Sequence, residues 1–326
     1  FHSTMKVLRV LLLVAIVDAQ RLGQYNVDRS QISVSGFSSG GAFSTQFHVV
    51  HSGTIMGAAI FAGMPYNCFI YYGVSGCGQE PENINIARLV QDTRDFAITG
   101  DIDAVEGISR AKVYLFQGPN DFTVQEGNGP AIREYYQNFG SDIATMFTTN
   151  AGHGFPTNDY GNDCDTSSPP AINRCDYSGA FGALNHIYGG SLTDPGTAWT
   201  PNEENLIEFD QTEFADEFGI TSFDDLGWIY VPTRCQDGSI ACRFHIQFHG
   251  CSQGRVWQGT QYALYTGYNS VAEANDIIIL HPNIDVTDSN PSGCWDWYAI
   301  EDTEYQTRNG VMVSVIKSMI DRVTGP

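Results

Sequence analysis

The sequence predicts an α/β fold of the α/β-hydrolase class, with a mostly parallel sheet and helices on both faces. Three observations lead to this expectation. Short apolar runs alternate with longer segments of helical period, as in a parallel sheet with crossover helices. A G-x-S-x-G motif follows one of these runs, and polar residues follow others. The length of 326 residues is ordinary for one such domain.

The N-terminus has the pattern of a secretory signal peptide. Lys6 and Arg9 precede an apolar run at residues 10–17, and Ala19 follows as a small residue at a cleavage position. The run is too short for a membrane anchor that spans a bilayer. We therefore expect residues 1–19 to be a signal peptide, with a short extension before Met5. Residues 20–326 are expected to form a single secreted catalytic domain.

The net charge of the chain limits the classes of partner that it is expected to bind. Sixteen basic residues against 37 acidic ones give a net charge of −21, which argues against nucleic-acid binding and against docking on anionic membranes. An acidic surface repels anionic ligands and suits a neutral substrate. We expect a monomer that binds a polyester or a small ester, with no metal, cofactor, nucleic-acid or membrane partner.

The eight cysteines are expected to form four disulfides. An even number of cysteines behind a signal peptide is typical of an exported, oxidised protein. The first six fall into three close couples, and the last two pair by remainder. A zinc site is the alternative, but no C-x-x-C spacing occurs. The expected pairs are Cys68–Cys77, Cys164–Cys175, Cys235–Cys242 and Cys251–Cys294.

The elements follow in order along the chain. Apolar runs bounded by turn residues predict strands at residues 32–35, 57–63, 112–116, 143–148, 228–231, 244–248 and 277–280. Helical periodicity predicts helices at residues 41–47, 83–99, 131–139, 262–275 and 304–322, and a less regular one at 203–218. Residues 66–78 are rich in glycine and aromatic residues and are expected to form a loop. Residues 160–223 are expected to form a capping insertion.

The segment around Ser38 is the expected centre of the chemistry. It has the strand, sharp turn and helix that a nucleophile elbow requires, with glycines two positions before and after the serine. Bulky residues there would clash, because the turn is so tight. The alternative is a small-residue turn that only packs a helix against a strand. We expect Ser38 to be a nucleophile and the amide of Ser39 to point at the substrate carbonyl.

A serine nucleophile needs a base and a carboxylate that orients the base. Asp121 and His153 each follow a predicted strand, and the order serine, acid, histidine is that of α/β-hydrolases. Either residue alone has an ordinary explanation, since aspartate and glycine-flanked histidine are common in turns. His186, in a glycine-rich segment, is the best alternative base.

The second oxyanion donor is expected at the amide of Cys251. His249 and Gly250 precede it at the end of a predicted strand, which is how this fold class places such a donor. The alternative is an ordinary turn with a disulfide. In α/β-hydrolases the strand that carries this donor precedes the nucleophile, but here it follows some two hundred residues later. We therefore expect a circularly permuted chain, an arrangement that proteins tolerate when their termini lie close together.

These segments together resemble the secreted, single-domain poly(3-hydroxybutyrate) depolymerases of the fungal type. The likeness extends over the elbow, the segments around Asp121 and His153, residues 248–253 and residues 293–297. The permuted order is itself a feature of that type. The resemblance implies Ser38 as nucleophile, His153 as base, Asp121 as its partner, and the Ser39 and Cys251 amides as the oxyanion hole. It also implies a surface crevice for one polymer chain and exposed apolar residues that adsorb to polyester.

Two questions stay open at this point. Trp295 and Trp297 either line the crevice and contact substrate or belong to the core, which is where tryptophans beside a cysteine more often lie. The substrate is also open, because triad motifs report the reaction and not the acyl group. We expect hydrolysis of a short-chain polyhydroxyalkanoate through an acyl-enzyme. The alternatives are an esterase for feruloyl, acetyl or other small esters, and a non-catalytic binding protein on an esterase scaffold.

Overall fold

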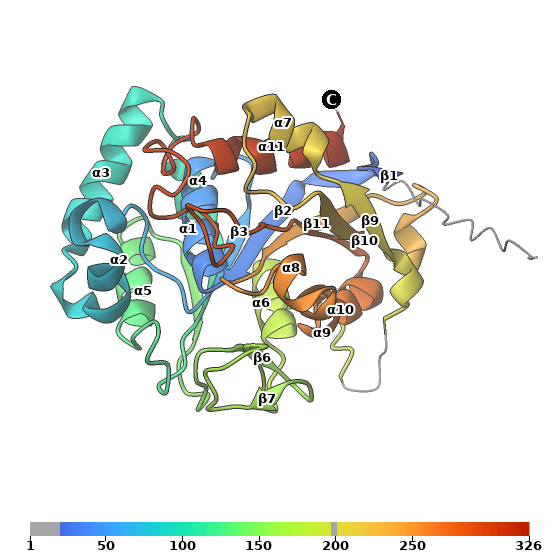
Figure 1. Cartoon of the computed structure of the whole chain (residues 1–326), viewed down its shortest axis with the longest axis horizontal. Helices are drawn as coiled ribbons and strands as arrows, with labels where there is room; N and C mark the ends of the chain where they lie inside the picture. Colours follow the sequence, from blue (N-terminus) through green and yellow to red (C-terminus); the bar gives the residue numbers. More distant parts are fainter. Residues whose placement is uncertain (1–19, 197–200, 326) are drawn as a thin grey trace, which may run out of the picture.

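A computed structural model describes residues 20–196 and 201–325. The expected signal peptide, residues 1–19, lies outside the described residues. Nine strands form one twisted central sheet in the order β1-β9-β10-β12-β11-β2-β3-β4-β5 (Figure 1). Its strands are β1 Gln20–Arg21, β2 Val27–Phe37, β3 Gly57–Phe61, β4 Lys112–Phe116, β5 Asp142–Met146, β9 Leu206–Asp210, β10 Leu226–Tyr230, β11 Cys242–Phe248 and β12 Ile277–His281.

Helices flank the sheet on both faces, as the sequence predicts (Figure 1). They are α1 Ser39–Val50, α2 Phe69–Gln79, α3 Ile86–Thr99, α4 Glu106–Arg110, α5 Asn128–Gln137, α6 Gly179–Ile187, α7 Thr212–Phe218, α8 Arg255–Gln258, α9 Gln261–Tyr265, α10 Tyr268–Asn275 and α11 Val311–Thr324, with short 3₁₀ turns η1 Pro81–Asn83, η2 Glu203–Asn205 and η3 Thr233–Cys235. In the part of the chain that the structure describes, none of the helices is long and apolar enough to cross a membrane.

The sheet is mostly parallel, which confirms the predicted fold class. The six neighbours from β12 to β5 all run the same way, whereas β10 is antiparallel to both β12 and β9. The register pairs Phe248 with Gly36, Phe37 with Phe61, and Phe61 with Phe116. The carboxyl ends of β11, β2, β3 and β4 therefore meet at one edge, where loops from distant parts of the sequence converge.

The first and last described segments lie beside each other. The Tyr25 amide donates to the Val323 carbonyl at 2.9 Å, and the Arg29 guanidinium donates to the Thr324 carbonyl at 3.1 Å. Figure 1 shows the C-terminal end close to β1. A circular permutation requires this proximity, and the permutation itself stays a prediction.

Residues 160–223 differ from the expected capping insertion. Part of the segment joins β6 Phe155–Thr157, β8 Ile172–Arg174 and β7 Asn162–Asp163 in a small separate sheet. The rest belongs to the main fold, because α6 packs on β3 and β4, and β9 is a strand of the central sheet. The predicted helix at 203–218 is likewise wrong in its first half, where β9 pairs with β10.

The expected loop at residues 66–78 is also wrong, because α2 occupies most of it. Glycine-rich composition usually indicates a loop. Here Gly73, with φ 64° and ψ −178°, breaks the segment into two short helical pieces, and the Cys68–Cys77 disulfide closes it. The helix forms one side of a cavity described below.

Candidate active site

The turn between β2 and α1 is fixed by close backbone contacts. Ser38 has φ 57°, a left-handed conformation that is strained for a residue with a side chain. Its amide donates to the Phe61 carbonyl at 2.9 Å. A Cβ on Gly36 would lie 2.1 Å from the Gly40 carbonyl oxygen, and one on Gly40 would lie 2.3 Å from the His249 carbonyl oxygen. Only glycine fits at both positions, so the motif follows from steric exclusion.

The Ser38 hydroxyl, the His153 imidazole and the Asp121 carboxylate form one line of hydrogen bonds. The Ser38 Oγ lies 2.9 Å from His153 Nε2, and His153 Nδ1 lies 2.8 Å from Asp121 Oδ2. With the proton on Nδ1, the ring donates to the carboxylate and accepts from the hydroxyl. A serine in this arrangement can pass its proton to the imidazole as it attacks a carbonyl carbon.

The neighbours of this line hold the acid and the base in place. Asp121 Oδ1 accepts from the amides of Thr123 and Val124 at 2.9 and 2.8 Å, and the carboxylate is 1% exposed. The His153 amide donates to Ser167 Oγ at 2.8 Å, and the imidazole packs against Phe37 with ring centroids 4.8 Å apart. Both functional side chains therefore have their orientation fixed before any substrate arrives.

Ser39 and Cys251, the residues predicted to supply the oxyanion donors, line the same cavity as Ser38. The three residues line a cavity of about 510 Å³, and neither amide donates to a protein acceptor within residues 20–196 and 201–325. The first turn of α1 leaves the Ser39 N–H without a helical partner. Two unpaired donors beside a nucleophile can bind a developing oxyanion.

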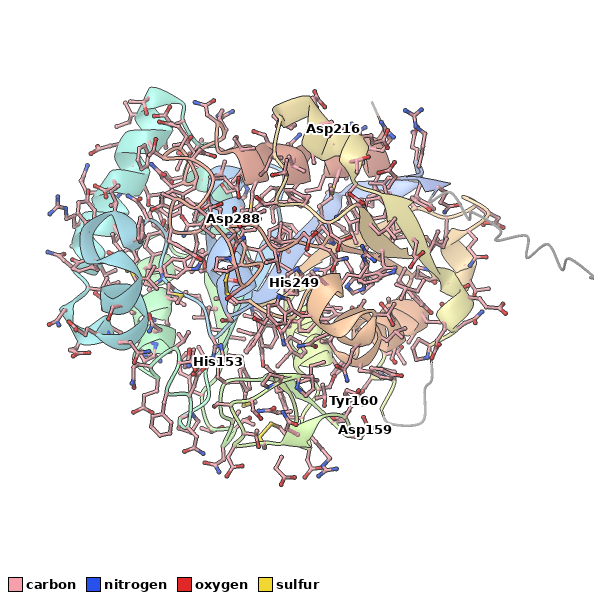
Figure 2. All side chains as sticks on the ribbon, viewed as in Figure 1. His153, Asp159, Tyr160, Asp216, His249 and Asp288 are labelled. Atoms are coloured by element: carbon pink, nitrogen blue, oxygen red, sulfur yellow. A yellow bond between two sulfur atoms is a disulfide. The ribbon has the colours of Figure 1, made fainter. Side chains whose placement is uncertain are left out.

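His249 fixes the loop that carries Cys251. Its Nδ1 donates to the Gly250 carbonyl at 2.7 Å, and its Nε2 accepts from the Ile284 amide at 3.1 Å. Burial lowers the pKa of His249 to about 4, so the neutral ring that makes both bonds persists at neutral pH. The Gly250 amide donates to Gln253 Oε1 at 2.7 Å. Figure 2 labels His249 near the centre of the view and His153 below and to the left of it.

The cavity beside Ser38 has no charged lining residue, and we call it the Ser38 cavity. Its apolar lining comes from elements far apart in the sequence: Met64, Val74 of α2, Val124, Trp297 and Tyr298. Nothing in the sequence marks Met64, Val74 or Tyr298 as lining residues, because isolated apolar residues occur throughout the chain.

The structure separates the two candidate tryptophans. Trp297 lines the Ser38 cavity. Trp295 is fully buried, stacks on Phe43 with ring centroids 5.0 Å apart, and is not among the lining residues. Trp295 is therefore a core residue in this structure, and only Trp297 is placed to contact a substrate.

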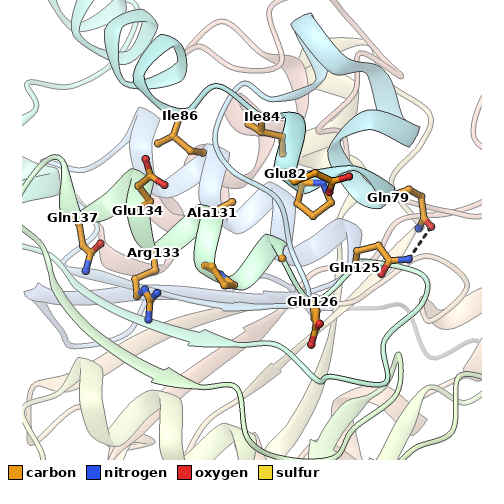
Figure 3. A pocket seen from close by; sticks show the side chains of 13 residues that line it. Gln79, Glu82, Ile84, Ile86, Gln125, Glu126, Ala131, Arg133, Glu134 and Gln137 are labelled. Atoms are coloured by element: carbon orange, nitrogen blue, oxygen red, sulfur yellow. Dashed lines mark hydrogen bonds between the residues drawn. The ribbon is translucent and has the colours of Figure 1, made fainter.

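A larger cavity lies away from the triad. It measures about 780 Å³ and is bounded by η1, the start of α3 and α5 (Figure 3). Glu82, Glu126 and Glu134 line it, and Gln79 at its edge also lines the Ser38 cavity. It contains no paired nucleophile and base, so its size alone does not make it a reaction site.

Two further histidines, His186 and His245, have their partners away from Ser38. His186, the alternative base, contacts the Asp142 carbonyl at 3.0 Å and not Ser38. His245 lies between Ser33 and Ser35 in a buried network below the elbow. Within residues 20–196 and 201–325, no group of three or more histidine, cysteine or acidic side chains is arranged to hold a metal ion.

Four disulfides are present, and they are the four expected pairs. They join Cys68 to Cys77, Cys164 to Cys175, Cys235 to Cys242 and Cys251 to Cys294. The last pair ties the loop of Cys251 to the segment that carries Trp297. This link connects two sides of the Ser38 cavity covalently.

Comparison with known proteins gives the family. No family model matches the chain. A polyhydroxybutyrate depolymerase from Talaromyces funiculosus is 31% identical over 96% of this chain and 95% of its own length. The chain belongs to the poly(3-hydroxybutyrate) depolymerase family. A poly(3-hydroxybutyrate) depolymerase from Delftia acidovorans is 38% identical over 94% of this chain, and this chain spans 62% of that protein's length.

Solved depolymerase structures share the fold. The crystal structure of the depolymerase from Penicillium funiculosum superposes with a TM-score of 0.86 and 30% identity, over 94% of this chain and 99% of the other. A serine-to-alanine variant of a PHB depolymerase, in complex with an R3HB trimer, gives the same values. The resemblance seen in the sequence is therefore confirmed at the level of family and fold.

Proposed function

We propose that this depolymerase-family protein hydrolyses the ester bonds of poly(3-hydroxybutyrate) or a related short-chain polyhydroxyalkanoate. The observation that carries the proposal is the hydrogen-bonded line from Ser38 through His153 to Asp121, which opens on an uncharged cavity. A neutral, largely apolar polyester suits such a lining. The names of the family members and the R3HB trimer bound to a related structure support the same substrate class.

The proposed reaction has two halves. In the first, Ser38 Oγ attacks the ester carbonyl carbon while His153 Nε2 takes the hydroxyl proton, and the Ser39 and Cys251 amides bind the oxyanion. The tetrahedral intermediate collapses as His153 returns this proton to the departing alcohol end of the polymer. An acyl-enzyme on Ser38 and a shortened chain remain.

In the second half, water replaces the departed alcohol. His153 takes a proton from the water, whose oxygen attacks the acyl carbonyl and forms a second oxyanion in the same place. Collapse breaks the bond to Ser38 Oγ, which regains the proton from His153, and releases a hydroxyacid. The Asp121 carboxylate stabilises the transient imidazolium. Losing one oxyanion donor typically raises such a barrier by about 3–4 kcal/mol.

The test is clearing of a poly(3-hydroxybutyrate) suspension. Purified protein should clear the suspension and release hydroxyacid, and Ser38→Ala should lower the rate by at least about 10⁴-fold, since the nucleophile cannot be replaced. Methyl ferulate and p-nitrophenyl esters serve as comparison substrates. Hydrolysis confined to those soluble esters would favour the small-ester alternative, and clearing by Ser38→Ala would end the assignment.

We propose further that the protein is exported and acts as a monomer. Four disulfides support export, since such bonds form and persist in oxidising compartments. Size-exclusion chromatography with light scattering tests the monomer, for which the expected mass is near the 35.8 kDa of the whole chain or slightly less after processing.

A further inference from the structure

Asp296 is a buried carboxylate that the proposed chemistry does not use. Asp296 lies between Trp295 and Trp297 in the sequence and is 1% exposed. Within the described ranges 20–196 and 201–325, no lysine, arginine or histidine forms an ion pair with it. Burial raises the pKa of the Asp296 carboxyl. Burying a carboxylate without a cation costs free energy, which hydrogen bonds to the carboxylate can offset.

The compensation comes from the backbone just after it. Asp296 Oδ1 accepts from the amides of Tyr298 at 3.2 Å and Ile300 at 2.9 Å, and Oδ2 accepts from the amide of Glu301 at 3.0 Å. Three N–H groups converge on one carboxylate, and such charge-assisted bonds are stronger than neutral ones. They close residues 297–301 into a turn, which we call the crevice wall.

The crevice wall carries the aromatic side of the Ser38 cavity. Trp297 and Tyr298 both line the cavity, with ring centroids 5.1 Å apart. Ala299, which follows Tyr298, has a φ of 58°, a strained left-handed conformation for a residue with a Cβ. A strained backbone persists only where its surroundings hold it, and the three bonds to Asp296 span this residue.

We infer that Asp296 is a positioning residue for substrate, which holds the crevice wall so that Trp297 and Tyr298 form a fixed surface for the polyester chain. The inference rests on the proposed function and deepens it, because it names the group that shapes the substrate side of the site. Asp296 touches neither the substrate nor the triad and acts through the two aromatic rings.

Asp296→Asn tests the inference with little change in shape. Asparagine keeps one acceptor oxygen and replaces the other with an amide nitrogen, so at least one wall amide loses its partner. We expect the KM for a soluble 3-hydroxybutyrate trimer to rise about tenfold, equivalent to about 1.4 kcal/mol. The kcat for p-nitrophenyl acetate should stay within about twofold, since an acetyl group lacks the polymer chain that the wall is inferred to hold.

Asp28→Asn is the matched control. Asp28 also accepts from a backbone amide, that of Ser30 at 2.9 Å, but it lies at the opposite end of β2 from Ser38. This variant should leave both kinetic constants unchanged. Asp296→Asn should also increase acrylamide quenching of tryptophan fluorescence, because a released wall exposes Trp297.

A double-mutant cycle shows whether Asp296 acts through Trp297. In a Trp297→Ala background, Asp296→Asn should add little to the KM for the trimer, since the group being positioned is already gone. Unchanged KM and unchanged quenching in Asp296→Asn would overturn the inference, and so would an equal loss of kcat on both substrates. A wild-type protein that neither clears the polymer suspension nor cleaves the trimer would instead contradict the proposed function, and the quenching comparison would still test Asp296.

Discussion

The nucleophile turn at residues 36–40 and the crevice wall at residues 297–301 are neighbours held by different means. The turn contacts the segment just before the wall, where Ser39 Oγ accepts from the Trp295 amide at 3.3 Å. The turn is fixed by backbone atoms packed so closely that no Cβ fits at Gly36 or Gly40. The crevice wall is fixed by side chains, namely the Asp296 carboxylate and, just before it, the Cys251–Cys294 disulfide.

This difference determines how each region responds to amino-acid substitution. Steric exclusion permits one residue type, so the turn has a short and recognisable motif and little tolerance. A side-chain tether leaves the backbone intact when it is removed, so the wall should loosen without loss of the fold. Substitutions in the turn should therefore reduce stability and activity together, whereas replacement of the Asp296 carboxylate should weaken substrate binding without loss of the fold.

The largest expected effect on stability comes from removing the wall's covalent tether. Replacing Cys251 and Cys294 with serine frees a loop of 43 residues, for which the chain-entropy model gives about 4 kcal/mol. Urea unfolding should show this loss, and the KM for the trimer should rise because both sides of the Ser38 cavity lose their link.

Cys235 and Cys242 provide the control. Their separation of 7 residues predicts a smaller loss of about 2.5 kcal/mol, at a site away from the triad. The KM for the trimer should not change in that double variant. Equal effects of the two disulfides on KM would contradict the comparison.

The next effect concerns the turn. Gly40→Ala would place a Cβ 2.3 Å from the His249 carbonyl oxygen, and the backbone must shift to relieve the contact. We expect a loss of about 3 kcal/mol in the free energy of unfolding, together with loss of esterase activity. Gly78→Ala is the control for stability, since its nearest neighbours lie at 3.7 Å. A Gly40→Ala protein as stable and active as the wild type would show that sterics do not fix the turn.

The smallest effect is the response of each region to pH. His245 contacts Ser33 and Ser35 below the turn, and burial lowers its pKa to about 3. Because this folded-state pKa lies below the unfolded value of about 6.5, its contribution to stability is complete above pH 6.5 and is lost as the pH falls. Linkage gives about 2 kcal/mol between pH 7 and pH 5 for one such histidine.

His245→Gln should remove that share of the pH dependence. Urea unfolding of the variant at both pH values should show a drop in stability about 2 kcal/mol smaller than that of the wild type. The raised pKa of Asp296 has the opposite effect on the pH dependence of stability. Burial disfavours the ionised carboxylate, so the folded state loses stability as the pH rises above about 3.8, the unfolded value. Asp296→Asn should therefore not reduce the acid sensitivity.

Much of the architecture was predictable because its signals are local. The strands near residues 112–116 and 244–248 are apolar runs bounded by turns, and β4 and most of β11 occupy them. Each of Ser38, Asp121 and His153 follows a predicted strand. The sequence therefore predicts that all three lie at the same edge of a parallel sheet. Sequence order and strand ends were enough for this result.

The regions that the sequence did not predict depend on tertiary contacts. Residues 206–210 lie in a polar stretch that looks helical, yet they pair with β10 and β1 at the side of the sheet. Gly73 made α2 look like a loop, although a disulfide and packing hold two helical pieces around it. Trp295 and Trp297 are two residues apart in the sequence, which does not indicate which of them lines the cavity. In the folded chain, Trp297 lines the Ser38 cavity and Trp295 is buried in the core.

Covalent labelling of Ser38 tests the central claim most directly. A fluorophosphonate probe should modify the wild-type protein once, and peptide mass spectrometry should place the adduct on Ser38. Labelling should disappear in Ser38→Ala and slow strongly in His153→Ala, because the hydroxyl then lacks its base. A wild-type protein that stays unlabelled, or one labelled equally fast without His153, would contradict the account.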